Sequence, residues 1–243
     1  MKHRTVFEIH DHAVGSMGRM PESWLAACRV GAVNWAVVRL LAVASMVVDH
    51  AAIIFGGGMG WRLLGRAAIP GFFLLLLAGL ERTSSREKYA ARLFLVGIVA
   101  QGVYSAFWMT DTLCILFTLG LVVLLAERRA AEVVLVVAAL AGVEWWRSDV
   151  ILEGGAWSVG LLVLGHHAGR RWWLASVSAA SFAVYLWPFA TWWGVAFGAE
   201  SAAWATILWF GTRFAWDAPT WMRTGWWWYW FYPLHMALLL VLE

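Results

Sequence analysis

Charged side chains are scarce in this sequence. Asp, Glu, Lys and Arg make up only 14% of its 243 residues, whereas soluble globular domains contain roughly 25%. Hydrophobic residues make up 62%, and the mean hydropathy is +0.70. This composition excludes an ordinary soluble domain. We attribute the small net charge of +3 to basic loops at a membrane surface, and no nucleic-acid partner is expected.

Cysteine is almost absent, since only Cys28 and Cys114 occur. Two cysteines so far apart provide neither a disulfide framework nor metal-ligand spacing, and no bound metal is expected. A continuous apolar core is also missing from residues 1–33, so no cleavable signal peptide is visible there. We predict a cytoplasmic mobile tail over 1–33 and a single transmembrane domain over 34–243.

Long apolar runs recur from Asn34 onward, and a helix needs about 20 apolar residues to cross a bilayer. The sequence therefore predicts an all-α polytopic membrane protein with about nine spans, between eight and ten. Basic residues concentrate in alternate loops, which indicates a cytoplasmic N-terminus in contact with membrane lipids. The expected helices are 34–55, 62–80, 90–108, 112–126, 131–146, 154–166, 172–197, 200–213 and 226–242.

Two ionisable side chains share one face of the first expected helix. Arg39 and His50 are 11 residues apart, which places them on one stripe roughly 16 Å apart along the axis. Asp49 is rotated about 100° from His50. Ionisable residues inside membranes are rare and usually mark a site. We interpret Arg39 and His50 as functional. The alternative is structural, with Asp49 in a helix–helix hydrogen bond and His50 lining a wet crevice.

The second expected helix opens with two arginines, Arg62 and Arg66, on one face. Two cations at a helix N-terminus oppose the macrodipole unless an anion or a carboxylate compensates. Arg66 is a candidate donor to an oxyanion, and Arg62 is a candidate phosphate ligand or a lipid-headgroup contact. Pro70 should free a backbone carbonyl one turn earlier and bend the helix.

Basic residues gather in the following loop, and isolated polar residues lie in later helices. The loop either fixes topology or holds nucleotide phosphates. Gln101 and His235 are candidate substrate contacts, and the alternative for Gln101 is an interhelical hydrogen bond. The loop residues concerned are Arg82, Arg86, Lys88 and Arg92.

Five segments, taken in order, resemble the TraX family, which is named for the F-pilin acetylase of conjugative plasmids. Within that family the chain is most similar to pilin-acetylase-type transfer proteins of broad-host-range plasmids. The segments are RLLAVASMVVDH (39–50), RLLGRAAIPGFF (62–73), LAGLERTSSREKYAARL (77–93), CILFTLGL (114–121) and FYPLH (231–235).

The spacing of Arg39 and His50 is also similar to the R/K-x10-H signature of membrane acyltransferases that pass acetyl groups to extracytoplasmic acceptors. This resemblance implies that His50 is the catalytic base and that Arg39 supports it. Glu153 stands where relatives commonly have an Asp-Tyr-Gly pattern, so the resemblance assigns it no role.

These resemblances imply a multi-pass acetyltransferase of the bacterial inner membrane that moves acetyl from acetyl-CoA to the N-terminal amine of pilin or propilin. His50, Asp49 and Arg66 are then the expected base, orienting group and oxyanion donor. Arg39, Arg62 and the basic loop would bind acetyl-CoA. One alternative is O-acetylation of an envelope sugar hydroxyl. Another is a non-enzymatic pilus-assembly protein whose buried charges pair between helices.

Overall fold

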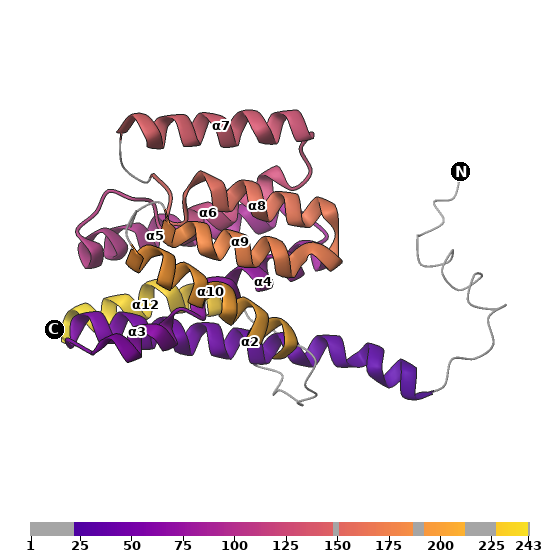
Figure 1. Ribbon diagram of the computed structural model, residues 1–243, viewed down its shortest axis with the longest axis horizontal. Coiled ribbons are helices and arrows are strands. Elements are labelled where there is room, and N and C mark those ends of the chain that lie inside the picture. Colours follow the sequence, from indigo (N-terminus) through magenta and orange to yellow (C-terminus); the bar gives the residue numbers. More distant parts are fainter. Residues whose placement is uncertain (1–21, 148–150, 187–191, 212–226, 243) are drawn as a thin grey trace.

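The computed structural model describes residues 22–147, 151–186, 192–211 and 227–242, which form helices joined by short loops (Figure 1). Within these ranges the extended backbone pairing is a single isolated bridge between Leu113 and Leu152. The helices are α2 (Glu22–Ile54), α3 (Met59–Gly65), α4 (Ala68–Arg82), α5 (Arg86–Trp108), α6 (Ile115–Leu125), α7 (Ala130–Arg147), α8 (Gly155–Ala168), α9 (Trp173–Leu186), α10 (Trp192–Gly211) and α12 (Trp227–Leu242), with a 3-10 turn at Arg170–Trp172.

Three stretches of the described chain are long and apolar enough to cross a bilayer. They are Trp35–Ile54, Met59–Arg82, which comprises α3 and α4, and Arg86–Trp108. Shorter apolar helices occupy Ile115–Leu125 and Trp228–Leu242. The chain is therefore a helical membrane protein. The count of nine spans and the cytoplasmic N-terminus stay predictions.

Two expected helix boundaries differ from the structure. Helix α2 begins at Glu22, within the range assigned to the tail, and residues 1–21 of that tail lie outside the described residues. The single helix expected over 172–197 is wrong, because α9 ends at Leu186 and α10 begins at Trp192. Glu200, the first residue of the helix expected over 200–213, lies inside α10, near enough to Arg66 to interact electrostatically.

Helix α4 lies at the centre of the bundle. It contacts α2, α9 and α10, and its side chains Phe73, Leu74 and Leu77 are completely buried. Helix α7 lies at one side of the molecule and packs on α8, while α2, α3 and α12 lie on the opposite side (Figure 1). Apolar residues such as Val134 and Leu135 are exposed on α7, as expected for a lipid-facing helix.

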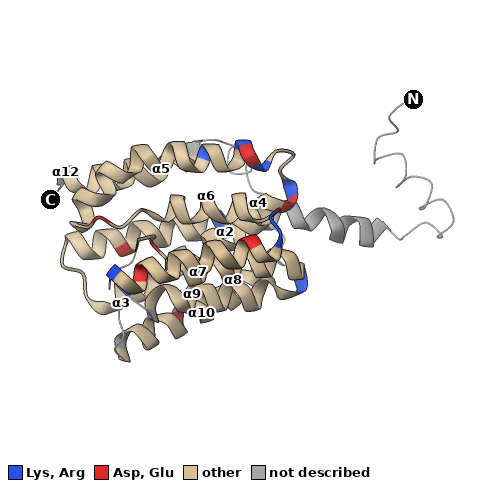
Figure 2. Ribbon diagram, turned by 90° about the horizontal axis from the view of Figure 1, so that it is seen from above, with Lys and Arg blue, Asp and Glu red and all other residues tan. Residues whose placement is uncertain are grey.

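Connecting loops gather at the two ends of the helices in alternation. Arg86 in the α4–α5 region forms a 2.6 Å ion pair with Glu127 in the α6–α7 loop. Arg170, after α8, lies near enough to Arg82 to interact electrostatically. Figure 2 shows charged residues mostly near helix ends, whereas the lengths of the helices are largely uncharged. The basic loops therefore share one end of the bundle, as the positive-inside pattern requires.

Candidate functional site

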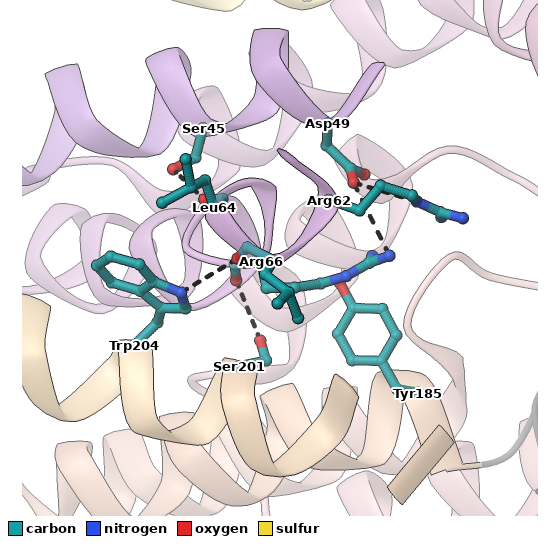
Figure 3. A network of polar contacts seen from close by, with 9 residues as sticks. Ser45, Asp49, Arg62, Leu64, Arg66, Tyr185, Ser201 and Trp204 are labelled. Carbon is teal, nitrogen blue, oxygen red and sulfur yellow. Dashed lines mark hydrogen bonds and ion pairs between the residues drawn. The ribbon is translucent and has the colours of Figure 1, made fainter. Parts of the chain in front are cut away.

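The chain breaks between α3 and α4. Pro70 has no N–H, and its ring clashes with the carbonyl of the residue four positions earlier, which is Arg66. Helix α3 accordingly ends at Gly65 and α4 begins at Ala68, so the bend predicted from Pro70 is confirmed. Side chains donate to the carbonyl that Pro70 frees and to two others at the break (Figure 3): Ser201 Oγ to Arg66 O at 3.2 Å, Ser45 Oγ to Leu64 O at 2.9 Å and Trp204 Nε1 to Leu63 O at 3.3 Å.

This break brings two arginines to one carboxylate. The distances to Asp49 Oδ1 are 3.7 Å from Arg62 Nε and 3.8 Å from Arg66 Nη2. Gly65 permits this approach, because a Cβ there would lie 2.9 Å from the Asp49 Cα and would collide with its side chain. Two cations at a helix N-terminus need a compensating negative charge, and Asp49 provides it.

The Arg66 guanidinium is held between aromatic rings. Its Nη1 donates to the Tyr185 hydroxyl at 3.1 Å, and its Cζ lies 4.7 Å and 4.4 Å from the ring centroids of Tyr185 and Phe197. The side chain is 6% exposed. Ion pairing and cation–π contacts together fix this buried cation between α2, α9 and α10.

His50 and His235 form a buried pair. His50 Nδ1 lies 2.8 Å from His235 Nε2, and the ring planes differ by 7°. His235 Nδ1 lies 2.8 Å from the carbonyl oxygen of Phe231, one turn earlier in α12. A carbonyl oxygen only accepts, so Nδ1 of His235 carries the hydrogen and, in a neutral ring, Nε2 accepts. His50 Nδ1 therefore donates, which leaves the lone pair of neutral His50 on Nε2.

His235, not Asp49, orients the His50 ring. Residues 49 and 50 project about 100° apart on α2, so Asp49 contacts the arginines while His50 contacts α12. The structure thus gives no support to the orienting role expected for Asp49, whose carboxylate pairs with Arg62 and Arg66. No sequence pattern pairs two histidines that are 185 residues apart. The rings beside His50 were not predicted either: they are Phe107 and Trp108, whose centroids lie 5.1 Å and 5.8 Å from that of His50.

A cavity of about 310 Å³ lies between α2, α4, α5, α6 and α12. We call it the arginine pocket, because Arg39, Arg82 and Arg92 line it at the end where the basic loops gather. Arg39 is stacked on Trp228, with its Cζ 5.6 Å from the ring centroid. Apolar residues line the pocket farther along the helices, ending with Met46, Phe72, Ile115 and Tyr232.

The arginine pocket points toward the histidine pair. His50 lies four residues beyond Met46 and His235 three residues beyond Tyr232, so each is about one helical turn past the lining. The Tyr232 and His235 rings are in edge-to-face contact, with centroids 6.0 Å apart. The apolar end of the pocket therefore lies about one helical turn from the histidine pair, which is not part of its lining.

The residues expected to bind acetyl-CoA, the acetyl donor, do not all lie in one place. Arg39, Arg82 and Arg92 line the pocket, whereas Arg86 pairs with Glu127. Lys88 is exposed and does not line the pocket. Arg62 pairs with Asp49 and does not line the pocket, so its assignment to the donor phosphates stays a prediction.

Gln101 has a structural role. Its Nε2 donates to Ser105 Oγ at 3.0 Å and to the Thr112 carbonyl at 2.9 Å, and its Oε1 accepts from the Cys114 N–H at 2.9 Å. These bonds close the α5–α6 loop and occupy the amide. These contacts favour the alternative of a structural hydrogen bond, and the expected role in substrate binding stays a prediction.

Glu153 caps α6 from the loop between α7 and α8. Its Oε2 accepts from the Ile115 N–H at 2.8 Å and from the Tyr232 hydroxyl at 3.4 Å, and its carbonyl accepts from Thr118 Oγ1 at 2.6 Å. A carboxylate is favourable at a helix N-terminus. Burial nevertheless disfavours its charge and raises the pKa of Glu153 from 4.5 to about 7.

We expect Glu153→Gln to flatten the dependence of stability on pH. Between pH 4.5 and about 7, the folded state holds a proton on Glu153 that the unfolded state has lost. The free energy of unfolding of the unaltered protein should therefore fall as pH rises through this window. Thermal unfolding in detergent, followed from about pH 5 to about pH 8, measures this fall in stability. Exposed Glu132→Gln is the control, and identical profiles for both variants would contradict the expectation.

The chain is similar in sequence to known proteins. A family model described as "TraX protein" matches residues 34–243. The chain belongs to the TraX protein family, which confirms the resemblance seen in the sequence. The "Probable fimbrial assembly protein FimC, serogroup H1" of Dichelobacter nodosus is 29% identical over 114 residues, covering 39% of this chain and 46% of the relative. The chain thus spans less than half of this relative's length. No solved structure matches the chain.

Proposed function

We propose that this chain is a multi-pass acetyltransferase of the bacterial inner membrane that acetylates the N-terminal amine of pilin subunits with acetyl-CoA. The observation that carries this proposal is the arginine pocket, which is lined by three cations at one end and whose apolar end lies about one helical turn from the His50–His235 pair. The TraX family and the fimbrial assembly relative support a role related to pili.

The arginine pocket matches the chemistry of a coenzyme A thioester. Guanidinium groups bind phosphates through paired N–H donors, which suits Arg39, Arg82 and Arg92 to the nucleotide end. The apolar lining between Met46 and Tyr232 suits the pantetheine arm. The axial distance from Arg39 to His50 is roughly 16 Å, which is comparable to that arm when it is extended.

His50 Nε2 suits the proton transfer. A free α-amine has a pKa of about 7.7 to 8, so a neutral imidazole can accept the proton that an attacking amine must lose. His235 keeps the His50 Nδ1 hydrogen in place and so presents Nε2 to the substrate. Cys114 is a poor nucleophile here, because its buried thiol faces the Gly97 carbonyl at 3.8 Å. Direct attack of the amine on the thioester is therefore favoured.

Purified protein, incubated with acetyl-CoA and a pilin N-terminal peptide, should add one acetyl group to the peptide and release coenzyme A. Mass spectrometry of the peptide and a thiol assay measure the two products. A peptide with a blocked α-amine is the control. Acetylated envelope sugar with unmodified pilin would instead identify O-acetylation, and no acetyl-CoA turnover with either acceptor would contradict an enzymatic function.

Arg92→Gln is expected to raise KM for acetyl-CoA while kcat changes little, because the change removes a contact made equally in the ground and transition states. Loss of one charge-assisted hydrogen bond corresponds to about a tenfold to hundredfold rise. Lys88→Gln is the matched control, since Lys88 is an exposed cation in the same helix, like Arg92, but does not line the pocket. Equal KM values for the two variants would contradict binding of the donor in this pocket.

A further inference from the structure

An unused hydrogen-bond donor lies beside His50. Trp108 ends α5, and its Nε1 is buried with no hydrogen-bond partner among the described residues. Its indole is in edge-to-face contact with the His50 ring, with centroids 5.8 Å apart and planes at 76°. A buried donor without a partner is destabilising, and such groups are few in folded proteins. Its place next to the candidate base suggests that a substrate atom supplies the partner.

Two neighbouring rings carry the two functions that acyl transfer needs, a base on His50 and a hydrogen-bond donor on Trp108. Nε2 of His50 can accept a proton, because its Nδ1 hydrogen is committed to His235. The indole N–H can only donate, so it neither takes up a proton nor competes with His50 for one. A donor aimed at a developing oxyanion is commonly among the largest contributions to catalysis.

Arg66 does not fill this role. Its Nη1 donates to Tyr185, its Nη2 pairs with Asp49, and its guanidinium is enclosed by aromatic rings. Moving it toward a substrate would leave Asp49 and the Tyr185 hydroxyl without this partner. Trp108 requires no such rearrangement.

We propose that Trp108 is a catalytic residue whose indole N–H binds the carbonyl oxygen of the acetyl thioester. This inference rests on the proposed acetyltransferase function. The amine nitrogen attacks the carbonyl carbon, a C–N bond forms, and the carbonyl π electrons move to the oxygen held by Trp108. His50 Nε2 takes the proton from the nitrogen. The C–S bond then breaks, the carbonyl re-forms, and the departing thiolate receives that proton from His50 to give coenzyme A.

Substitution of Trp108 by Phe removes the N–H and keeps an aromatic ring. Replacement of Trp108 by β-(3-benzothienyl)alanine keeps the bicyclic shape and exchanges N–H for sulfur. We expect both to lower kcat by about 10²–10³-fold and to leave KM for acetyl-CoA within about threefold. Trp173→Phe is the matched control, since Trp173 is buried and its Nε1 has no hydrogen-bond partner in the described residues, but it contacts Trp35 and Trp209 instead of His50.

The outcomes separate the two proposals. A large fall in kcat for the benzothienyl variant, with Trp173→Phe near the wild-type rate, supports the assignment of Trp108. Active wild-type protein with unchanged kcat in the benzothienyl variant overturns that assignment alone. If only Trp108→Phe is impaired, ring shape rather than the N–H matters, and the assignment is also overturned. Absence of acetyl transfer by the wild-type protein overturns the proposed function and this inference with it.

Discussion

His50→Ala is expected to lower kcat for acetyl transfer by about 10²–10⁴-fold, which is the usual contribution of a positioned base. The change removes Nε2, the lone pair that the hydrogen bonds from His50 to His235 and from His235 to the Phe231 carbonyl leave available. It also leaves His235 Nε2 without its donor, so His50→Ala combines a chemical loss with a structural one.

His50→Asn separates these two losses. The asparagine amide can donate to His235 in place of Nδ1, but it has no basic nitrogen. We therefore expect a variant as stable as the wild-type protein and as inactive as His50→Ala. His167→Ala, at an exposed position near the end of α8, controls for the loss of a histidine. Coenzyme A release by the folded His50→Asn variant at the wild-type rate would exclude His50 as the base.

Arg66→Met should lower the free energy of unfolding by about 3–5 kcal/mol, the cost of removing one member of a buried ion pair. Asp49 would keep only the charge of Arg62, whose Nε is 3.7 Å away but whose side chain is more exposed than that of Arg66. The Tyr185 hydroxyl would lose the donor at 3.1 Å. Unfolding of the purified protein by heat or by SDS, in mild detergent, measures the change.

A double variant tests the cause of this loss. Arg66→Met combined with Asp49→Asn also removes the carboxylate that Arg66→Met leaves with one partner fewer. The double variant should therefore lose less free energy of unfolding than the two single variants lose in sum. Arg128→Met is the surface control. Arg128 pairs with Glu132 at 3.9 Å, and both side chains are about half exposed or more, at 63% and 47%. We expect Arg128→Met to lower the free energy of unfolding by about 0.5 kcal/mol or less. Equal losses for Arg66→Met and Arg128→Met would contradict a buried network.

Local features of the fold could be predicted because they depend on nearby residues. Apolar length located the helices, and Pro70 located the break, since a proline acts on the carbonyl four residues earlier. The start of α5 lies at the Ser85 cap, whose Oγ accepts from the Lys88 N–H, and the basic residues that follow obscured it. Glu200 was misinterpreted because its neighbour Arg66 is far away in sequence.

The site was only half predictable for the same reason. An ionisable residue inside an apolar span is conspicuous in the sequence, so Arg39, His50 and Arg66 could be singled out as candidates. Their partners come from other helices, and no periodicity connects His50 with His235 or Arg66 with Tyr185. Trp108 could not be singled out among 20 tryptophans, because it is distinguished only by the combination of an N–H without a partner and contact with the His50 ring. Assigning the whole basic loop to acetyl-CoA binding was too broad, since charge alone does not show which side chains face the arginine pocket.

The break between α3 and α4 has a consequence for biogenesis. Its Arg66 carbonyl is satisfied by Ser201, which is synthesised 135 residues later. When α3 and α4 enter the bilayer, the partner that completes their backbone does not yet exist, although an open carbonyl in lipid is unfavourable. The N-terminal half therefore cannot reach its final conformation during translation by itself. Its maturation has to wait for α10, so this membrane domain is completed from its C-terminal half backward.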